Sequence, residues 1–231
     1  SLQETDIRIL IVAGEPGANV PATKKSLQEM WGATCYDDIG SSEISNFGYE
    51  CREQKGTHVI ESMFYVESLD PETLQPVADG EVGEMVITNL ITETAPLIRF
   101  RIKDLVRLDR SPCDCGRTFL RLNGGILGRT DDMFQFAGIN IFPSALENYI
   151  REIVEFSDEY QIIIPRQGRG NHLLIKVEPT ETSLTLAELQ VAKKRLIEKI
   201  KLNMTITPEV EIVETGELPR FEAKAKRVHR S

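Results

Sequence analysis

Three short runs carry most of the structural information in this chain: residues 96–105 read PLIRFRIKDL, residues 128–133 read GRTDDM and residues 138–143 read GINIFP. In the first run, Arg99, Arg101 and Asp104 alternate with isoleucine and phenylalanine. This period of two predicts a half-buried β-strand whose polar face carries both signs of charge. The second run interrupts the apolar pattern, which is typical of a domain boundary or a hinge. An ordinary strand followed by a solvated turn is the alternative.

The composition excludes several classes of protein. The 231 residues allow one large domain or two modest ones, and 41% hydrophobic with 27% charged residues is ordinary for a globular protein. The net charge of −9 argues against a nucleic-acid surface, which needs clustered Lys and Arg. No apolar run approaches the roughly 20 residues that cross a bilayer, and the first residues do not resemble a signal peptide. We therefore expect a cytoplasmic protein that binds neither nucleic acid nor membranes.

The N-terminal part, residues 1–47, is expected to be the end of an α/β subdomain with a parallel sheet. Residues 7–12 form a continuous apolar run, and residues 21–31 have helical spacing with a proline suited to a first turn. A second strand is expected at residues 34–36, followed by a loop at residues 37–43. Ligands favour such loops at the ends of parallel strands.

Two further parts complete the expected fold, which mixes α/β and α+β architecture. Residues 48–128 predict a β subdomain, because alternating strands such as 63–66 and 85–88 are separated by Asp-Pro and Asp-Gly turns. Residues 131–231 predict a small α+β lid domain. Its expected elements are helices at 144–154 and 186–201 and strands at 161–165, 173–177 and 209–213. The second helix is expected to pack into a core through Leu186, Leu189, Ala192 and Leu196.

The first two runs resemble two consecutive signature motifs of the adenylate-forming enzymes, and residues 140–143, NIFP, resemble the phenylacetate–CoA ligase branch. The resemblance implies activation of an aryl carboxylic acid by ATP to an acyl-AMP, followed by transfer to coenzyme A. No phosphate loop rich in Gly, Ser and Thr lies in the 231 residues. We therefore expect residues 1–130 to be the C-terminal part of a large adenylation domain, residues 131–231 to be the small C-terminal domain, and the missing N-terminal half to be their partner. Homodimer formation is left open.

The resemblance also implies a nucleotide site. Residues 13–17, AGEPG, resemble the adenine-side loop of these ligases, and residues 39–43, IGSSE, resemble their aromatic-Gly-x-Ser/Thr-Glu loop. In the second loop Glu43 would help to hold Mg²⁺ through oxygen coordination. Ile39 stands where an aromatic ring usually stacks on adenine, so the stacking geometry is lost. The nucleotide-binding residues implied in this way are Gly14, Glu15, Pro16, Ile39, Gly40, Ser42, Asp104 and Arg129. Asp104 matches a carboxylate that accepts hydrogen bonds from the ribose hydroxyls.

Three further positions match moving or catalytic parts of the family. Asp131 matches the hinge about which the small domain rotates, and Gly138 matches a loop on the coenzyme A side, where a missing side chain permits close approach. Residues 218–228, LPRFEAKAKRV, resemble the terminal lysine motif, with Lys224 as the matching residue and Ala223 where glycine is usual. The Lys224 ammonium would stabilise charge that grows between the substrate carboxylate and the α-phosphate. Lys224 and Glu43 are therefore the expected catalytic residues, and a solvated basic tail is the alternative for Lys224.

A second constellation indicates a metal site. Cys51 and His58 precede Cys113 and Cys115, so three thiols and one imidazole bracket the β subdomain. This donor set completes a tetrahedral zinc shell with no open position, which is typical of a structural Zn²⁺ rather than a catalytic one. A disulfide is disfavoured, because neighbouring Cys113 and Cys115 would close a strained ring and the cytoplasm is reducing. Isolated reduced thiols remain the alternative, and Cys35 is expected to stay outside the site.

Two other functions stay open at this point. The chain could be a non-catalytic, zinc-stabilised nucleotide-binding remnant or an accessory unit, because the phosphate loop is absent and Ile39 and Ala223 are atypical. It could also belong to an adenylating enzyme that does not use coenzyme A. The identity of the carboxylic acid is not encoded in these residues, because much of its pocket is expected in the missing half.

Overall fold

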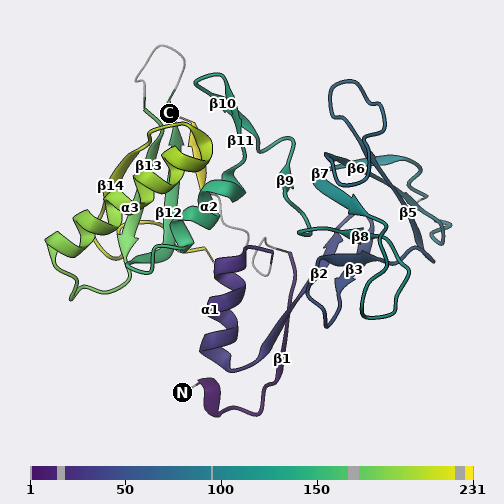
Figure 1. Ribbon diagram of the computed structural model, residues 1–231, viewed down its shortest axis with the longest axis horizontal. Coiled ribbons are helices and arrows are strands. Elements are labelled where there is room, and N and C mark those ends of the chain that lie inside the picture. The colour runs from purple at the N-terminus through teal and green to yellow at the C-terminus, as the bar shows by residue number, and fades with distance from the viewer. Residues whose placement is uncertain (1, 15–18, 95, 166–171, 222–226, 231) are drawn as a thin grey trace. The chain divides into compact units, whose positions relative to one another are not determined.

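The computed structural model describes residues 2–14, 19–94, 96–165, 172–221 and 227–230 (Figure 1). The chain divides into two compact units, residues 1–133 and residues 134–231. Both units mix helices with β-sheets, so the expected combination of α/β and α+β architecture is confirmed. Among the described residues, no helix has the length and apolar character needed to cross a membrane.

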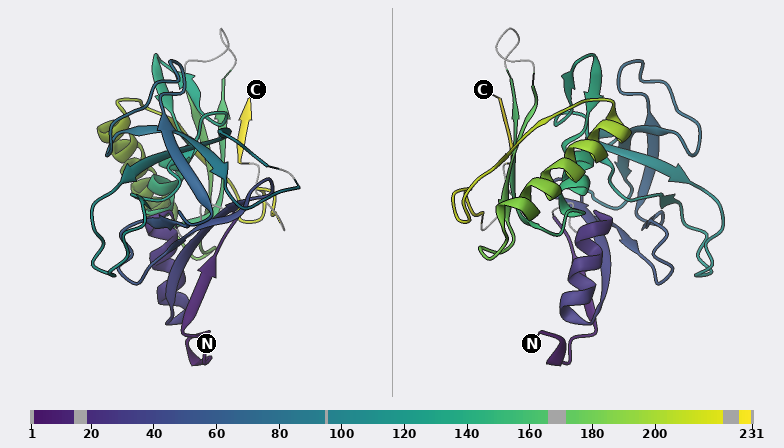
Figure 2. Two further views of the ribbon diagram at one scale, coloured as in Figure 1. Left: turned by 90° about the vertical axis from the view of Figure 1, so that its right-hand side faces the viewer. Right: turned by 60° about the vertical axis from the view of Figure 1, so that its left-hand side comes forward.

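The first unit opens with a parallel α/β fragment. A short 3-10 helix, Leu2–Glu4, precedes strand β1 (Ile9–Val12), helix α1 (Pro21–Trp31) and strand β2 (Thr34–Ser41). β1 and β2 are parallel, with α1 packed beside β2 (Figure 2). α1 begins with a proline, whose fixed φ suits a first turn. It ends where Gly32, at φ 63°, donates its N–H to the carbonyl of Gln28.

The rest of the first unit is antiparallel β-structure. Its strands are β3 (Ser45–Glu50), β4 (Thr57–Val59), β5 (Phe64–Leu69), β6 (Val82–Asn89), β7 (Phe100–Asp109), β8 (Arg121–Leu122) and β9 (Gly128–Arg129). Together with the parallel pair they form a nine-stranded sheet in the order β1-β2-β3-β4-β8-β7-β6-β5, with β9 paired to β7. The apolar core lies within this β-structure, where Phe47 and Phe64 meet edge to face with ring centroids 6.4 Å apart.

The prediction of a loop at residues 37–43 is wrong for its first five residues. β2 continues to Ser41 and then turns directly into antiparallel β3. Cys35, Asp37 and Ile39 are all buried, so the strand has a period of two that the polar residues hide. Gly40 permits the tight pairing, because a Cβ there would lie 2.9 Å from the carbonyl oxygen of Ser45.

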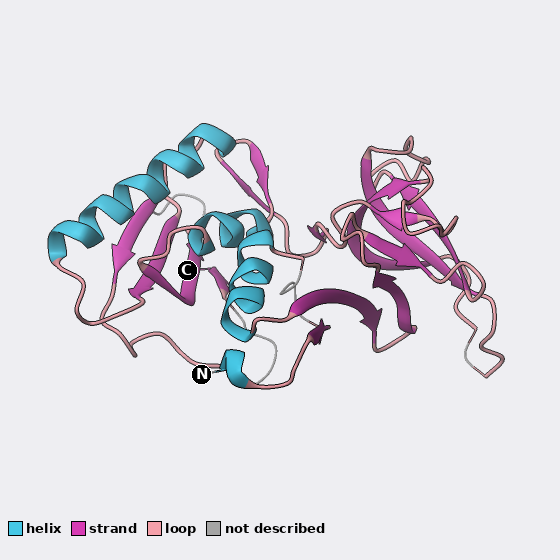
Figure 3. Cartoon of the chain, turned by 60° about the horizontal axis from the view of Figure 1, so that its bottom comes forward, coloured by secondary structure: helices cyan, strands magenta, loops and turns pink. Residues whose placement is uncertain are grey.

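The described part of the second unit contains a two-stranded hairpin, a four-stranded sheet and two helices. It begins with the hairpin β10 (Phe134–Phe136) and β11 (Ile139–Ile141) and helix α2 (Pro143–Arg151). The remaining elements are β12 (Phe156–Ile164), β13 (Leu174–Pro179), α3 (Leu186–Met204), β14 (Glu209–Ile212) and β15 (Val228–Arg230). The sheet order is β14-β13-β12-β15, in which only the β12–β13 pair is antiparallel. α2 and α3 contact each other and this sheet (Figure 3).

Helix α3 supplies much of the core of the second unit. Leu189, Ala192, Leu196 and Ile200 are buried at helical spacing, as the sequence predicts for the first three. Leu186 is 81% exposed, so its expected core position is wrong. It is the first residue of the helix, directly after Thr185, which with Glu188 forms a reciprocal capping box. The capping box therefore fixes where α3 begins, and the residues that pack into the core start one turn later, at Leu189.

Candidate functional site

The guanidinium of Arg129 joins two of the expected site carboxylates. Asp104 on β7 lies directly opposite Arg129 on β9 in the antiparallel register. Arg129 donates from Nη1 to Asp104 Oδ1 at 3.1 Å, and from Nε and Nη2 to the two carboxylate oxygens of Asp131 at 2.9 and 2.8 Å. These hydrogen bonds lower the pKa of Asp131 below its ordinary value. The structure therefore brings together Asp104, Arg129 and Asp131.

A bulge in β7 gives Asp104 its place. The register between β6 and β7 shifts between Glu84 and Val86, and Lys103 has a positive φ of 73°. Ile102 and Leu105 are both buried on either side of it, so strict alternation stops between them. The simple period of two across residues 98–104 is therefore wrong in detail. Ile98 precedes the strand and is 75% exposed, contrary to the expected apolar face.

Arg101 is used to hold the strand rather than to face a ligand. It forms two hydrogen bonds with the buried carboxylate of Glu84, at 2.7 and 2.8 Å. These bonds outweigh burial and lower the pKa of Glu84. Thr130, the residue after Arg129, donates to the same carboxylate at 3.4 Å, and its N–H donates to the carbonyl of Lys103 at 2.8 Å. Glu84 could not be recognised from the sequence, because no local pattern distinguishes it from the other acidic residues.

The other expected nucleotide residues are spread along the first unit. Ser42 and Glu43 are exposed in the turn between β2 and β3, next to Gly40. Ile39 is 6% exposed and belongs to the apolar core, so its side chain has little surface to offer a base. β3, β4 and β8 separate β2 from β7 in the sheet order. These roles stay predictions.

The structure describes the expected site glycines Gly14 and Gly138, but not the expected catalytic lysine. Gly14 has a φ of 86° and a Cβ there would meet nothing within 4 Å, while Glu15 and Pro16 lie outside the described residues. Gly138 lies in the β10–β11 turn with a φ of 79°, preceded by Ala137 at 51°. Two positive φ values are typical of a tight hairpin turn, so the backbone explains the glycine without a close neighbour. Lys224 lies outside the described residues.

The four expected metal ligands converge in the first unit. The ligand atoms of Cys51, His58, Cys113 and Cys115 all lie within 4.8 Å of one another. The Cys51 and Cys113 sulfurs are 3.7 Å apart, and the Cys115 sulfur is 3.5 Å from His58 Nε2. His58 is fully buried, Cys51 and Cys113 are almost fully buried, and Cys115 is partly exposed. Such a group could hold a metal ion, and Cys35 lies outside it.

The surroundings of this cluster favour metal binding. His58 Nδ1 lies 3.1 Å from the carbonyl oxygen of Phe119, so an N–H at Nδ1 would leave the Nε2 lone pair facing the sulfurs. Burial opposes ionisation of the Cys115 thiol, but hydrogen bonds from Arg117 and the other thiols lower its pKa to about 6. Burial raises the pKa of Cys51. Phe119 and Arg117 were not found from the sequence, although both follow Cys115 within four residues.

Comparisons with known proteins agree with these motifs. The model of the AMP-binding enzyme C-terminal domain matches residues 138–230. The chain is 35% identical to a phenylacetate-coenzyme A ligase of Thermus thermophilus, over 99% of the chain and 55% of that protein. It is 38% identical to a phenylacetate-coenzyme A ligase of Escherichia coli K12, over 96% of the chain and 51% of that protein.

A solved structure extends the agreement to the fold. The crystal structure of a 2-hydroxyisobutyryl-CoA ligase, in the postadenylation state with 2-HIB-AMP, is 31% identical to the chain and has a TM-score of 0.90. The match covers 97% of this chain and 48% of that one. The chain thus spans about half the length of the curated relatives it matches. It belongs to the adenylate-forming enzymes, as the resemblance predicted, and corresponds to the C-terminal half of such an enzyme.

Proposed function

We propose that this chain, together with an N-terminal half, uses ATP to activate an aryl carboxylic acid such as phenylacetate, first to the acyl-AMP and then to the acyl-CoA thioester. The observation that carries the proposal is the similarity of nearly the whole chain to proteins named phenylacetate-coenzyme A ligases. Three of them are 33% to 38% identical over 96% to 99% of the chain. The N-terminal half would supply the phosphate loop and much of the acid pocket.

The geometry around Asp104 supports a ribose-binding role. An ionised carboxylate only accepts hydrogen bonds and has room for several donors, which suits two neighbouring hydroxyls. The Asp104 side chain is 14% exposed, so it is shielded but reachable. Arg129 holds one of its oxygens from the facing strand at 3.1 Å. A carboxylate oriented in this way would bind a ribose with little loss of side-chain freedom.

The position of Asp131 supports a hinge. It lies two residues before the division between the compact units, and its side chain is 50% exposed. A rotation there would let the second unit serve two half-reactions in turn. In the first, Lys224 would stabilise charge between the acid and the α-phosphate, and Glu43 would help to hold Mg²⁺ beside Ser42. In the second, the turn with Gly138 would face coenzyme A.

One observation is also consistent with the non-catalytic alternative. Ile39 packs into the core instead of presenting a flat ring to a base. A nucleotide-binding remnant would explain why no aromatic ring stands at this position of the adenine site. An adenylating enzyme that does not use coenzyme A would carry out the first half-reaction alone. The two half-reactions must therefore be measured separately.

We expect the complete enzyme to form phenylacetyl-AMP from phenylacetate, ATP and Mg²⁺, and phenylacetyl-CoA once coenzyme A is added. Mass spectrometry of the products, with acetate as the comparison acid, makes the measurement. Formation of the acyl-AMP with no thioester would point to another acceptor. If folded enzyme makes neither product from any acid, the remnant alternative holds.

The substitution Asp104→Asn should reduce kcat/KM for ATP in adenylation by about 100-fold, because two hydrogen bonds to a charged acceptor are worth about 3 kcal/mol. The amide keeps the shape but replaces one acceptor by a donor. Asp79→Asn is the matched control, since Asp79 is half-exposed and pairs with the exposed Arg110 at 3.4 Å. Equal kinetics of the two variants would remove Asp104 from the nucleotide site.

We further propose that the four-residue cluster holds a structural Zn²⁺. Two sulfurs each about 2.3 Å from a tetrahedral zinc lie about 3.8 Å apart, and a sulfur and an imidazole nitrogen about 3.6 Å apart. The corresponding distances in the cluster are 3.7 Å for Cys51–Cys113 and 3.5 Å for Cys115–His58. A thiol with a pKa of about 6 at Cys115 would also lose its proton readily to solvent when a metal binds the sulfur. All four positions would be filled by protein atoms, so no water could be activated there.

Purified protein should contain about one equivalent of zinc, as expected for a closed four-ligand site. Cys113→Ser should lose the metal and lower the melting temperature, whereas Cys35→Ser should keep it, since Cys35 is an equally buried thiol outside the cluster. Elemental analysis and thermal melts with and without a chelator make the measurement. Stable, fully folded protein without metal would refute the site.

A further inference from the structure

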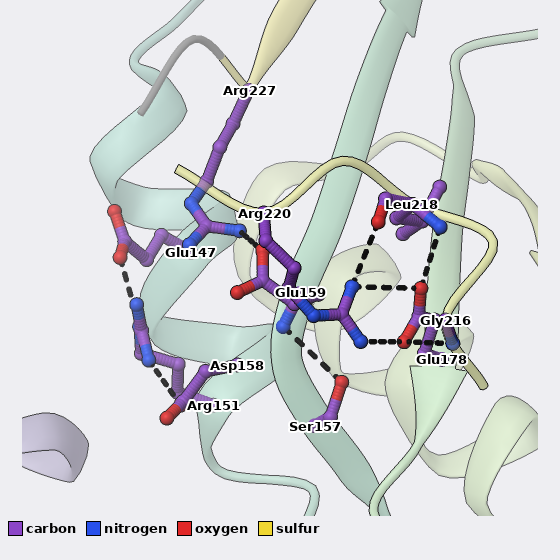
Figure 4. A network of polar contacts seen from close by, with 10 residues as sticks. All are labelled: Glu147, Arg151, Ser157, Asp158, Glu159, Glu178, Gly216, Leu218, Arg220 and Arg227. Atoms are coloured by element: carbon purple, nitrogen blue, oxygen red, sulfur yellow. Dashed lines mark hydrogen bonds and ion pairs between the residues drawn. The ribbon is translucent and has the colours of Figure 1, made fainter. Parts of the chain in front are cut away.

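A buried carboxylate in the second unit binds the chain at the start of the lysine motif. Glu178, on β13, is fully buried. Its Oε1 accepts the N–H of Leu218 at 2.6 Å, and its Oε2 accepts the N–H of Gly216 at 3.1 Å. Arg220 adds two parallel hydrogen bonds, from Nη1 to Oε1 at 3.1 Å and from Nη2 to Oε2 at 2.6 Å (Figure 4). Both oxygens of the carboxylate therefore bind the segment that follows β14.

This arrangement stabilises one conformation of that segment. A buried charge is tolerated when it is paired and its lone pairs are used, which is the case for Glu178. The hydrogen bonds from Arg220 are the largest cause that lowers the pKa of Glu178 to about 2. Arg220 Nη1 also donates to the carbonyl of Leu218 at 2.8 Å. The guanidinium thus ties its own backbone to β13, across 42 positions of sequence.

A second anchor lies at the other end of the motif. Arg227 donates from Nη1 to Glu159 at 2.9 Å, and its guanidinium lies 4.7 Å from the ring centroid of Tyr160. Its carbonyl accepts the N–H of Ile162 at 2.8 Å, where β15 pairs with β12. Arg220 and Arg227 are therefore bound to β13 and β12, which are neighbours in one sheet.

Only six residues, 221–226, separate these two anchors, and Lys224 is among them. We propose that Glu178 is a positioning residue for adenylation, which sets where the Lys224 segment leaves the sheet by binding Arg220 and the backbone before it. The inference rests on the proposed role of Lys224. Fixing both ends of a short segment limits the volume that its side chains search. A displacement of about 1 Å at a catalytic group can cost about 100-fold in rate.

The test compares the two half-reactions in the complete enzyme. Glu178→Gln keeps the shape of the side chain but removes its charge and turns one acceptor into a donor that faces Arg220. We expect adenylation of phenylacetate to fall by about 100-fold. Thioester formation from supplied phenylacetyl-AMP and coenzyme A should stay within about twofold of wild type, because the proposed role of Lys224 is confined to adenylation. An ion pair that only supports folding would reduce both half-reactions together.

Glu211→Gln is the matched control. Glu211 lies on β14 of the same sheet and pairs with Lys176 at 3.2 Å, and among the described residues it forms no hydrogen bond or ion pair with the segment that Glu178 binds. Both half-reactions should be unchanged in this variant. If Glu178→Gln does not fold, Arg220→Gln breaks the same clamp from its half-exposed side. Arg220→Lys should restore part of the adenylation rate.

A double variant separates this inference from the proposed function. Lys224→Ala alone should abolish adenylation, and adding Glu178→Gln should cause no further loss in any residual activity. Adenylation that survives Lys224→Ala contradicts the proposed function itself. Loss in Lys224→Ala with full adenylation in Glu178→Gln overturns the positioning role alone, as do equal losses of Glu178→Gln in both half-reactions.

Discussion

The guanidinium of Arg129 is the contact on which the candidate site depends. It binds Asp104 across the β7–β9 pair and Asp131 two residues along its own chain. The Asp104 carboxylate is largely shielded from solvent, whereas the Asp131 carboxylate is half-exposed. Exposed ion pairs contribute little to stability, about 0–1 kcal/mol. Breaking the ion pair between Arg129 and Asp131 therefore costs less than breaking the one between Arg129 and Asp104. A rotation at Asp131 would therefore leave the contact between Arg129 and Asp104 in place.

A buried glutamate binds an arginine side chain at two places in the described chain. Glu84 binds Arg101 and Thr130 at the β7 bulge, and Glu178 binds Arg220 after β14. Both glutamates are buried, and hydrogen bonds from their arginines lower the pKa of each. Charge-assisted, bidentate contacts of this kind define geometry more strictly than apolar packing does. The Cys/His cluster would do the same between the β3–β4 and β7–β8 connections, with metal–sulfur bonds.

Local signals let the sequence predict part of this structure. Helix α1 follows from helical spacing and a proline at its first turn, and its bounds at residues 21–31 are confirmed. The family follows from the order of several motifs, and the convergence of Cys51, His58, Cys113 and Cys115 follows from their chemistry. β2 was cut short because its Asp and Gly residues look like a turn, although Asp37 is buried. The β7 bulge was missed because periodicity counts residues and cannot register an insertion in one strand. The contact between Glu178 and Arg220 is not predicted, because the two residues lie 42 positions apart and no local pattern marks them as partners.

The central claim is that this chain is half of an enzyme that adenylates an aryl acid. Carboxylate-dependent exchange of pyrophosphate into ATP by the complete enzyme tests it most directly, because the exchange reports acyl-AMP formation without needing an acceptor. We expect exchange that requires Mg²⁺ and is faster with phenylacetate and related aryl acids than with acetate. Folded, Mg²⁺-supplied enzyme that shows no exchange with any of these acids would contradict it.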